Sequence, residues 1–423
     1  MIKRKELKMN IGKEYELLNQ LYFERISGTE SELKACRIIA DELTKIGLDS
    51  RIEAFDVVRN TVQKVKFEVT EPYHKVYEAT AYMGCVNADG LSAELAYFES
   101  DTPVSRKNAE GRIALVNGYL GMNKFKALCE AHAIGFITYN GDIDREENDL
   151  DPRELRESSQ VFGNMPGVNI RIQDAIELIE RQATHVKLTV EQTMQDEKSH
   201  NLICEIKGES EDWIVCCAHY DSVPNSKGAY DNATGAVCLY SIAEELKDRH
   251  LKHNIRFIWC GSEERGLLGS KAYVKDHGEE LEHIKLVVNV DMLGSVLGNR
   301  IAVSTADMSL VHYIDYYARV EGYPLESSQG VYSSDSTPFA DAGVPAVSFA
   351  RGSAGTARIH CRFDVMEHLS QRILGEDTEF ILKFVETMAN AYVIPVVREM
   401  PDNMKEELDK YLGRDLLKKE EKK

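Results

Sequence analysis

The chain has 423 residues, with 51 Lys and Arg against 70 Asp and Glu, so its formal net charge is −19. This length predicts two or three folding units, and 43% hydrophobic residues supply enough apolar material for their cores. So large an acidic excess repels nucleic-acid phosphates, and the sequence has no basic stripe with interleaved aromatics, so we expect no nucleic-acid partner.

Residues 1–23 have the pattern of an amphipathic helix and lack the apolar stretch of a secretory signal. No uncharged apolar run reaches the roughly 20 residues that cross a bilayer, so we expect no membrane partner. The nine cysteines are scattered and form no CxxC pair, which is typical of a reducing compartment. These features predict a cytoplasmic protein.

A helical pattern runs from Ile11 to about Gly47, and a strand-like stretch follows at Ser50–Val58. We assign residues 1–61 to the N-terminal helical part of the main domain. From residue 62 to 190 the chain changes to short β-like pieces between polar turns. Residues 62–190 are therefore predicted to form a separate, β-rich inserted domain.

Within this insert, Lys124–His132 has a helical pattern, and the acidic segment Asp142–Asp151 is typical of a solvated loop. The β-like pieces are Lys64–Val69, Ala93–Phe98, Arg112–Val116 and Gly135–Tyr139.

The pattern changes again at about residue 191, where strands and helices begin to alternate. Gly235–Leu246 has the apolar spacing of a packed helix. Residues 191–400 are thus predicted to form the core of an α/β fold, with a mixed, mostly parallel central sheet flanked by helices. The charged residues 401–423 are expected to fray or to extend as a helix. Near-continuous apolar runs predict strands covered on both faces at Trp213–Ala218, Ile255–Cys260, Leu286–Val290 and Ala346–Ala350.

Acidic residues and a histidine follow three of these strands at the point where each strand ends. His219 and Asp221 follow the first, Glu263 and Glu264 the second, and Asp291 the third. Each residue taken singly has an ordinary structural explanation, such as a solvated pair of glutamates. Because the carboxyl ends of parallel strands meet at one edge of a sheet, the coincidence predicts a single site there.

Two further residues complete a metal-binding set: Asp231, in a turn before a helix, and His360, in the loop after the fourth strand. Two imidazoles and three carboxylates can hold two divalent cations if one carboxylate bridges them. We assign His219, Asp231 and Asp291 to one ion and Asp231, Glu264 and His360 to the other. Each ion then keeps an open position, as in catalytic zinc sites. We expect two Zn²⁺, although such nitrogen and oxygen ligands also accept cobalt or manganese.

The two acidic residues left over have different predicted roles. Adjacent residues at a strand end point opposite ways, so Glu263 can face the water shared by the ions while Glu264 binds metal. Glu263 is our candidate general base, which takes a proton from that water and delivers it to the leaving amine. Asp221 is placed to accept the second ring N–H of His219 and so to orient the imidazole.

With these residues in place, the sequence resembles the co-catalytic dizinc peptidases of family M28, which include aminopeptidases and glutamate-carboxypeptidase relatives. The resemblance implies a zinc-peptidase-like α/β fold, the metal assignment above and a cis peptide bond between Asp231 and Asn232. Glu110–Asp142 resembles part of a protease-associated (PA) domain, which makes the predicted insert PA-like. The matching motifs are AHYDS (Ala218–Ser222), YDNATGA (Tyr230–Ala236), SEERGLLGS (Ser262–Ser270), NVDMLG (Asn289–Gly294), SDSTPFADAGVPAV (Ser334–Val347) and His360.

The sequence departs from the family at one position. Some members place a tyrosine directly before the last histidine as a donor to the oxyanion, but Ile359 stands there in this chain. Other members take the tyrosine from the loop before the Ser-Asp motif, where Tyr332 lies. Tyr332 is therefore a candidate oxyanion donor, and a packed loop aromatic is the alternative.

Together these features predict a dinuclear zinc aminopeptidase that hydrolyses the N-terminal bond of peptides through a metal-bridging hydroxide. Two alternatives stay open. A carboxypeptidase or other amide hydrolase on the same core could use Arg351 and Arg358 to bind a substrate carboxylate, and a metal-free binding protein could use the same scaffold. We expect peptides as partners, leave a homo-oligomer open, and expect the insert to restrict substrates or to form contacts between copies.

Overall fold

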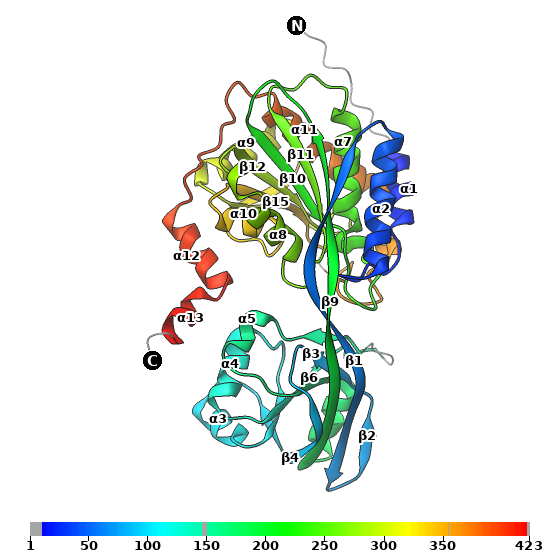
Figure 1. Ribbon diagram of the computed structural model, residues 1–423, viewed down its shortest axis with the longest axis vertical. Helices are drawn as coiled ribbons and strands as arrows, with labels where there is room; N and C mark the ends of the chain where they lie inside the picture. The colour runs from blue at the N-terminus through cyan, green and yellow to red at the C-terminus, as the bar shows by residue number, and fades with distance from the viewer. Residues whose placement is uncertain (1–10, 146–149, 354, 421–423) are drawn as a thin grey trace. The chain divides into compact units, whose positions relative to one another are not determined.

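The computed structural model describes residues 11–145, 150–353 and 355–420 (Figure 1). The chain divides into two compact units: unit 1 contains the residues up to Val57 and from Glu197 on, and unit 2 contains Val58–Asp196. The predicted insert, residues 62–190, falls within unit 2, whose limits lie slightly further out. The paired strands β1 (Ser50–Glu71) and β9 (His185–Ile206) belong in part to each unit.

Unit 1 is built on a sheet with the strand order β14-β13-β15-β12-β10-β11-β9. The four predicted core strands are present, and each is parallel to its neighbours among them. Strand β9 is antiparallel to β11 and β13 is antiparallel to β15, so the sheet is mixed and largely parallel, as predicted. The strands are β10 (Trp213–His219), β11 (Asn254–Cys260), β12 (Ile284–Val290), β13 (Arg300–Thr305), β14 (Leu325–Gln329) and β15 (Ala346–Arg351).

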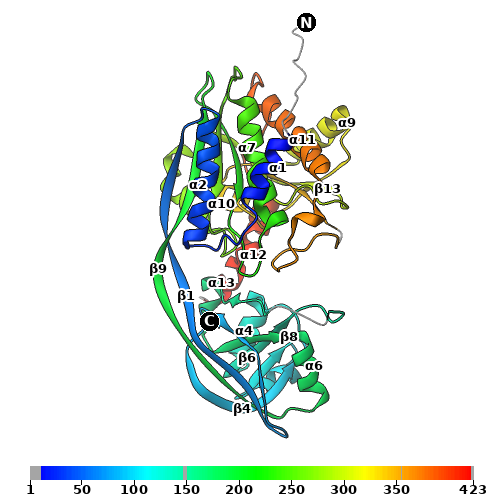
Figure 2. The ribbon, with the colours of Figure 1, turned by 90° about the vertical axis from the view of Figure 1, so that its right-hand side faces the viewer.

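Both faces of this sheet are covered, which explains the continuous apolar runs. In β10 the side chains of Ile214, Cys216 and Ala218 join one core, and Val215 and Cys217 join the core on the opposite face. Helices α1, α2, α7 and α11 pack against one another over the first face (Figure 2). The helices of unit 1 are α1 (Ile11–Gln20), α2 (Glu30–Lys45), α7 (Thr234–Leu246), α8 (Leu268–Asp276), α9 (Met308–Glu321), α10 (Ser336–Asp341), α11 (Gln371–Ala389), α12 (Asp402–Tyr411) and α13 (Arg414–Glu420).

The charged C-terminal segment forms α12 and α13. Met400, Met404 and Leu408 are buried and join the core beneath α10. Met404 and Leu408 are four residues apart on α12 and form a narrow apolar stripe within a highly charged stretch, and Met400 lies just before the helix. Of the two expected outcomes, fraying or helix, the described part of this segment is helical.

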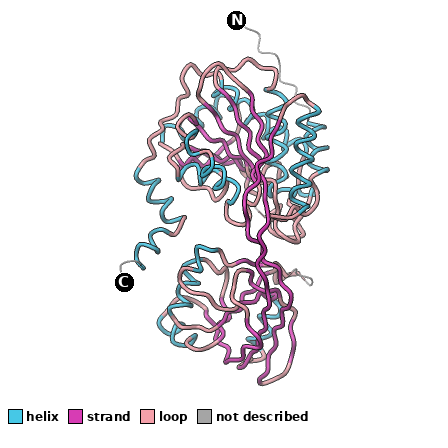
Figure 3. Tube along the Cα trace, viewed as in Figure 1, coloured by secondary structure: helices cyan, strands magenta, loops and turns pink. Residues whose placement is uncertain are grey.

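Unit 2 also combines helices and strands (Figure 3). Its strands β4, β5, β6 and β8 are successively parallel. Unit 2 contains more helix than the β-rich domain predicted from the sequence. The prediction missed these helices because only the Lys124–His132 region has a clear helical pattern. The two stretches predicted separately at Ser50–Val58 and Lys64–Val69 belong to the single strand β1. The elements of unit 2 include β2 (Lys75–Tyr77), β3 (Thr80–Met83), β4 (Ala88–Phe98), β5 (Ile113–Val116), β6 (Gly135–Asn140), β7 (Arg153–Glu154), β8 (Gly167–Arg171), α3 (Pro103–Ala109), α4 (Met122–Glu130), α5 (Glu157–Gln160) and α6 (Ile172–Glu180).

Among the helices that the structure describes, none has the length and apolar character needed to span a bilayer. Part of the predicted acidic loop, residues 146–149, lies outside the described residues.

Helix α1 brings an acid into the core of unit 1. Glu14 is fully buried, and Thr378 donates a 2.6 Å hydrogen bond to its Oε1. Burial raises the pKa of Glu14 to about 8 from the ordinary value of 4.5. The folded protein therefore keeps a proton on Glu14 at pH values where the unfolded chain has lost it, so stability falls as pH rises between these two values.

We predict that Glu14→Gln removes this dependence. Relative to the variant, the free energy of unfolding of the wild type should fall by up to about 1.4 kcal/mol per pH unit between pH 5 and pH 8. Urea unfolding at three pH values measures the difference. Glu16→Gln, an exposed position on the same helix, is the matched control and should follow the wild type. Parallel curves for the wild type and Glu14→Gln would refute the assignment.

Candidate metal centre

The candidate site lies at the carboxyl edge of the parallel strands. His219 is the last residue of β10 and pairs with Cys260 at the end of β11, so the loop that carries Glu263 and Glu264 starts beside it. Asp291 follows directly after β12, the neighbour of β10 on its other side. The parallel register therefore brings three sequence-distant groups to one edge.

Asp231 joins the two halves of the predicted metal set. Its Oδ1 lies 3.2 Å from His219 Nε2, and its Oδ2 lies 3.2 Å from His360 Nε2. Asp291 Oδ1 is 3.6 Å from the same His219 nitrogen, and Glu264 Oε2 is 3.0 Å from the same His360 nitrogen. One oxygen of Asp231 thus faces each half of the set, which is the arrangement of a carboxylate that bridges two ions.

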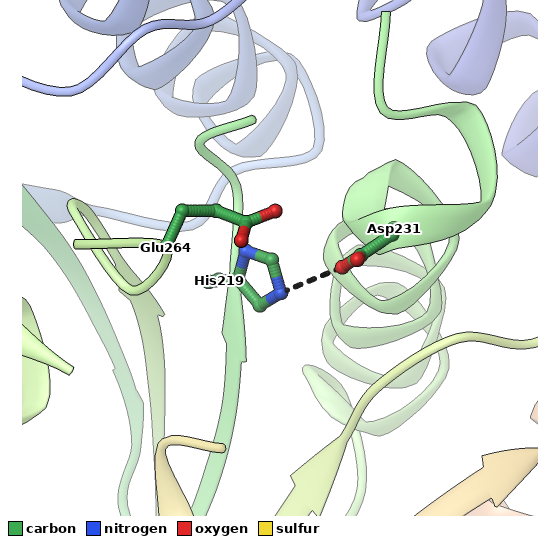
Figure 4. Close-up of side chains that lie close together, drawn as sticks. All are labelled: His219, Asp231 and Glu264. Carbon is green, nitrogen blue, oxygen red and sulfur yellow. Dashed lines mark ion pairs between the residues drawn. The ribbon is translucent and has the colours of Figure 1, made fainter. Parts of the chain in front are cut away.

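Figure 4 shows three of these residues, with the contact between His219 and Asp231 marked. One ligand atom each from His219, Asp231 and Glu264 lie within 4.8 Å of one another. Among the described residues, none donates a hydrogen bond to the buried Asp291 Oδ1. An unsatisfied buried oxygen beside imidazole nitrogens and carboxylates fits a divalent cation such as zinc.

The electrostatics of the site reflect crowded negative charge. Burial lowers the pKa of His219, but the surrounding carboxylates, Glu263 foremost, outweigh it and raise that pKa well above its ordinary value. Burial raises the pKa of Asp231, but its contacts with His219 and His360 outweigh burial and hold it below its usual range. Burial and the charge of Asp231 raise the pKa of Glu264 to about 6. Carboxylates crowded around two imidazoles form a charge pattern that divalent cations would balance.

Glu263, the candidate base, has an environment suited to holding a proton. Burial raises the pKa of its carboxyl well above the ordinary value; the charge of His219 opposes the shift, and Glu264 and Asp335 add to it. A carboxylate with a raised pKa is a better proton acceptor near neutral pH.

Asp221 does more than the sequence predicts. Its Oδ1 lies 3.4 Å from His219 Nδ1, a long contact in the predicted direction. Its shorter bonds are to the backbone: the N–H of Glu263 donates to Oδ1 at 3.0 Å, and the N–H of Glu264 donates to Oδ2 at 3.2 Å. Asp221 thus fixes the loop that carries both glutamates relative to the end of β10.

Sequence reasoning missed Arg25, which is fully buried between α1 and α2. Its guanidinium donates to the carbonyl of Tyr220 at 2.5 Å, next to His219, and to the carbonyls of Lys227 at 2.5 Å and Gly228 at 2.8 Å, shortly before Asp231. Arg25 therefore ties together the two loops that carry these candidate ligands. Nothing in the pattern around a single arginine distinguishes this role from a solvated one.

Two other missed residues hold the Asp231 turn. Asp364 accepts the N–H groups of Tyr230 at 2.7 Å and Asp231 at 3.1 Å. Asn232 donates to the carbonyl of Val290 at 2.9 Å and accepts the N–H of Met292 at 3.0 Å, the residues on either side of Asp291. The Asp231–Asn232 peptide bond is cis, as the family resemblance implies.

The remaining predicted residues are Tyr332, Arg351, Arg358 and Ile359. Burial, followed by the charges of Asp291 and Asp231, raises the pKa of the Tyr332 phenol. Arg351 is buried, and its Nε donates to the carbonyl of Ser295 at 2.7 Å. Ile359 is exposed, and Arg358 is half-buried.

The fold and the site are those of an α/β metallopeptidase. Residues 201–385 match the family model described as Peptidase family M28. Aminopeptidase YwaD of Bacillus subtilis is 29% identical over 376 residues, which cover 84% of this chain and 79% of that protein. Leucine aminopeptidase 2 of Trichophyton equinum is 31% identical over 196 residues, but the match spans only 38% of that relative.

Solved structures agree along nearly the whole chain. The zinc aminopeptidase BSAP from Bacillus subtilis has a TM-score of 0.76 at 27% identity, covering 94% of this chain and all of that one. The aminopeptidase from Aneurinibacillus sp. strain AM-1 has a similar fold, with a TM-score of 0.72 at 23% identity, over 92% and 96% of the two chains. Residues 201–385 are thus similar to peptidase family M28, and the similarity to a solved zinc aminopeptidase extends over 94% of the chain.

We predict that the wild type binds about two zinc ions per chain. Substitutions of different ligand residues should remove different numbers of these ions. Asp231→Ala should abolish binding of both, because one oxygen faces each half of the set, whereas Asp291→Ala should chiefly remove one. Elemental analysis after zinc loading and dialysis measures the ratio. Asp402→Ala, at an exposed position on α12, is the control. One tightly bound zinc in Asp231→Ala would contradict the shared carboxylate.

Proposed function

We propose that this protein is a zinc aminopeptidase that removes N-terminal residues from peptides with the help of two bound ions. The observation that carries the proposal is the division of the Asp231 carboxylate between two half-sites, each containing one imidazole and one further carboxylate. The match of residues 201–385 to family M28 and the similarity to a solved zinc aminopeptidase support the same reaction.

Zinc ions held by these residues would supply a nucleophilic water at neutral pH and polarise the scissile carbonyl. Glu263 accepts the proton that the attacking water loses and passes it to the leaving amine. Tyr332 donates its phenolic proton in a hydrogen bond to the oxyanion that develops on the carbonyl. Asp221 keeps Glu263 in place through the backbone N–H that it accepts.

The alternative of a carboxypeptidase is less well supported. It requires a cation that is free to bind the substrate carboxylate. Arg351 is buried, donates to the carbonyl of Ser295, and lies 3.9 Å from Asp377, so its charge is already engaged. A metal-free binding protein is disfavoured by the complete set of ligand residues at the strand ends.

We further propose that unit 2 is a PA-type domain and that the enzyme works in the cytoplasm. The resemblance of Glu110–Asp142 to PA domains supports the first point. All nine cysteines are free thiols, most of them buried, which supports a reducing compartment. An experimental structure of the insert and fractionation of the native cells, respectively, would test these two points.

The reaction is tested with one tripeptide in three forms: free at both ends, N-acetylated, and C-amidated. We predict cleavage of the free and C-amidated forms from the N-terminus and none of the N-acetylated form, measured by mass spectrometry of the products. Cleavage of the N-acetylated form with resistance of the C-amidated form would establish the carboxypeptidase alternative instead. Protein treated with a chelator is the control and should cleave none of the three.

Glu263→Gln keeps the size of the side chain but cannot accept the water's proton. We predict that kcat falls by about 10²–10⁴, or roughly 3–5 kcal/mol of barrier, while metal content and KM stay near wild type. Asp221→Asn gives the contrast, because loss of an orienting residue should weaken metal affinity by about 10–100-fold. If Glu263→Gln lost a metal and regained full turnover in excess zinc, the roles of Glu263 and Glu264 would have to be exchanged.

A further inference from the structure

Helix α12 contacts the loop that carries Tyr332 on both sides of that residue. The N–H of Val331 donates to Glu407 Oε1 at 3.2 Å. The hydroxyls of Ser333 and Tyr411 share a hydrogen bond of 2.6 Å. The residues directly before and after Tyr332 are thus each held by a side chain from α12.

The helix is itself firmly attached to unit 1. Met404 and Leu408 are buried in the core that contains Phe339 of α10. Arg414, at the start of α13, donates from its two terminal nitrogens to the two carboxylate oxygens of Asp341, each at 2.6 Å. A paired bond of this kind fixes orientation as well as distance. The segment after residue 400 is therefore an anchored part of unit 1, although it lies beyond residues 201–385, where the family match is found.

The rest of the loop is fixed from the opposite direction. The carbonyl of Tyr332 accepts the N–H of Ser334 at 2.8 Å and the hydroxyl of Thr337, in α10, at 2.7 Å. The N–H and carbonyl of Gly330 are bound by Ser304 and Thr305 of β13. These bonds hold the backbone of Gly330 and the carbonyl of Tyr332, and the bonds from α12 hold Val331 and Ser333 on either side of the tyrosine.

We propose that Glu407 and Tyr411 are positioning residues that hold the loop of Tyr332 in the position its role requires, so that the C-terminal helix is a working part of the active site. The inference rests on the proposed function, in which Tyr332 donates to the oxyanion. An oxyanion donor acts only at hydrogen-bond distance from the developing charge. A displacement of about 1 Å can cost as much as 10²-fold in rate. The two bonds from α12, one to the backbone N–H of Val331 and one to the side chain of Ser333, can therefore affect turnover.

Adjacent glutamates on α12 provide a matched test. Glu407 holds the loop, whereas Glu406 is exposed. We expect Glu407→Ala to lower kcat by about 10-fold or more, with KM and metal content unchanged. Glu406→Ala should leave kcat unchanged, and Glu407→Gln, which retains an acceptor oxygen, should restore most of the activity. A wild-type kcat in Glu407→Ala would overturn the proposal.

A double-mutant cycle with Tyr332→Phe separates positioning from a general effect on the fold. If Glu407 acts through Tyr332, adding Glu407→Ala to Tyr332→Phe should cause no further loss of kcat. Losses that multiply would show that Glu407 acts elsewhere and would overturn the proposal.

Hydrogen exchange gives a readout that does not depend on peptide cleavage. Amide exchange in residues 330–335 should increase in Glu407→Ala and not in Glu406→Ala, and unchanged exchange would overturn the inference. An inactive wild type with the expected exchange would instead count against the proposed aminopeptidase function. The two failures are therefore distinguishable.

Discussion

Buried carboxylates gathered at one sheet edge can remain ionised together only if positive charge lies among them. Asp231 is the centre of this constraint, because each of its oxygens lies within 3.2 Å of an imidazole nitrogen. His219 and His360 lie among these acids, and several of the acids have pKa values shifted upward. Burial and Asp231, for example, raise the pKa of Asp364 to about 7, against the opposing bonds from the Tyr230 and Asp231 amides. Divalent ions would balance the negative charge of these carboxylates with more positive charge, and they would also fix the positions of the side chains.

Holding mutually repelling groups together also requires rigid supports. The supports here are buried polar side chains that bind backbone rather than ligands. Asp221 fixes the glutamate loop, Arg25 ties the segment after β10 to the segment before Asp231, and Asn232 fastens the Asp231 turn around Asp291. Side chains held by satisfied buried hydrogen bonds lose little freedom on binding a ligand. The site is therefore built from two groups of residues. One group would bind the ions, and the other binds backbone groups and holds the first group in place.

The sequence predicts the first group better than the second, for a physical reason. Apolar runs covered on both faces identify the parallel strands, and the rule that such strands end at a common edge places His219, Glu264 and Asp291 together. Arg25 and Asp364 act on carbonyl and amide groups, which every residue possesses, so no spacing in the sequence signals them. The same limit applies to α12, whose two buried apolar residues, Met404 and Leu408, stand in a highly charged stretch. The strand β1 continues through a polar stretch. A prediction based on alternating apolar and polar residues ends the strand there, because the alternation is lost.

The ion pair between Asp56 and Lys198, at 2.5 Å, has a consequence for how this molecule can vary. It marks the place where the chain leaves unit 1 along β1 and returns along β9, and the two strands pair there. The two crossing points are one strand spacing apart, so a tight turn could join them as well as a whole domain does. The entropy of closing a loop rises only slowly with its length, so the number of residues between the two points has little effect on the stability of unit 1. The chain can therefore carry inserts of different lengths between β1 and β9 at a small cost in stability.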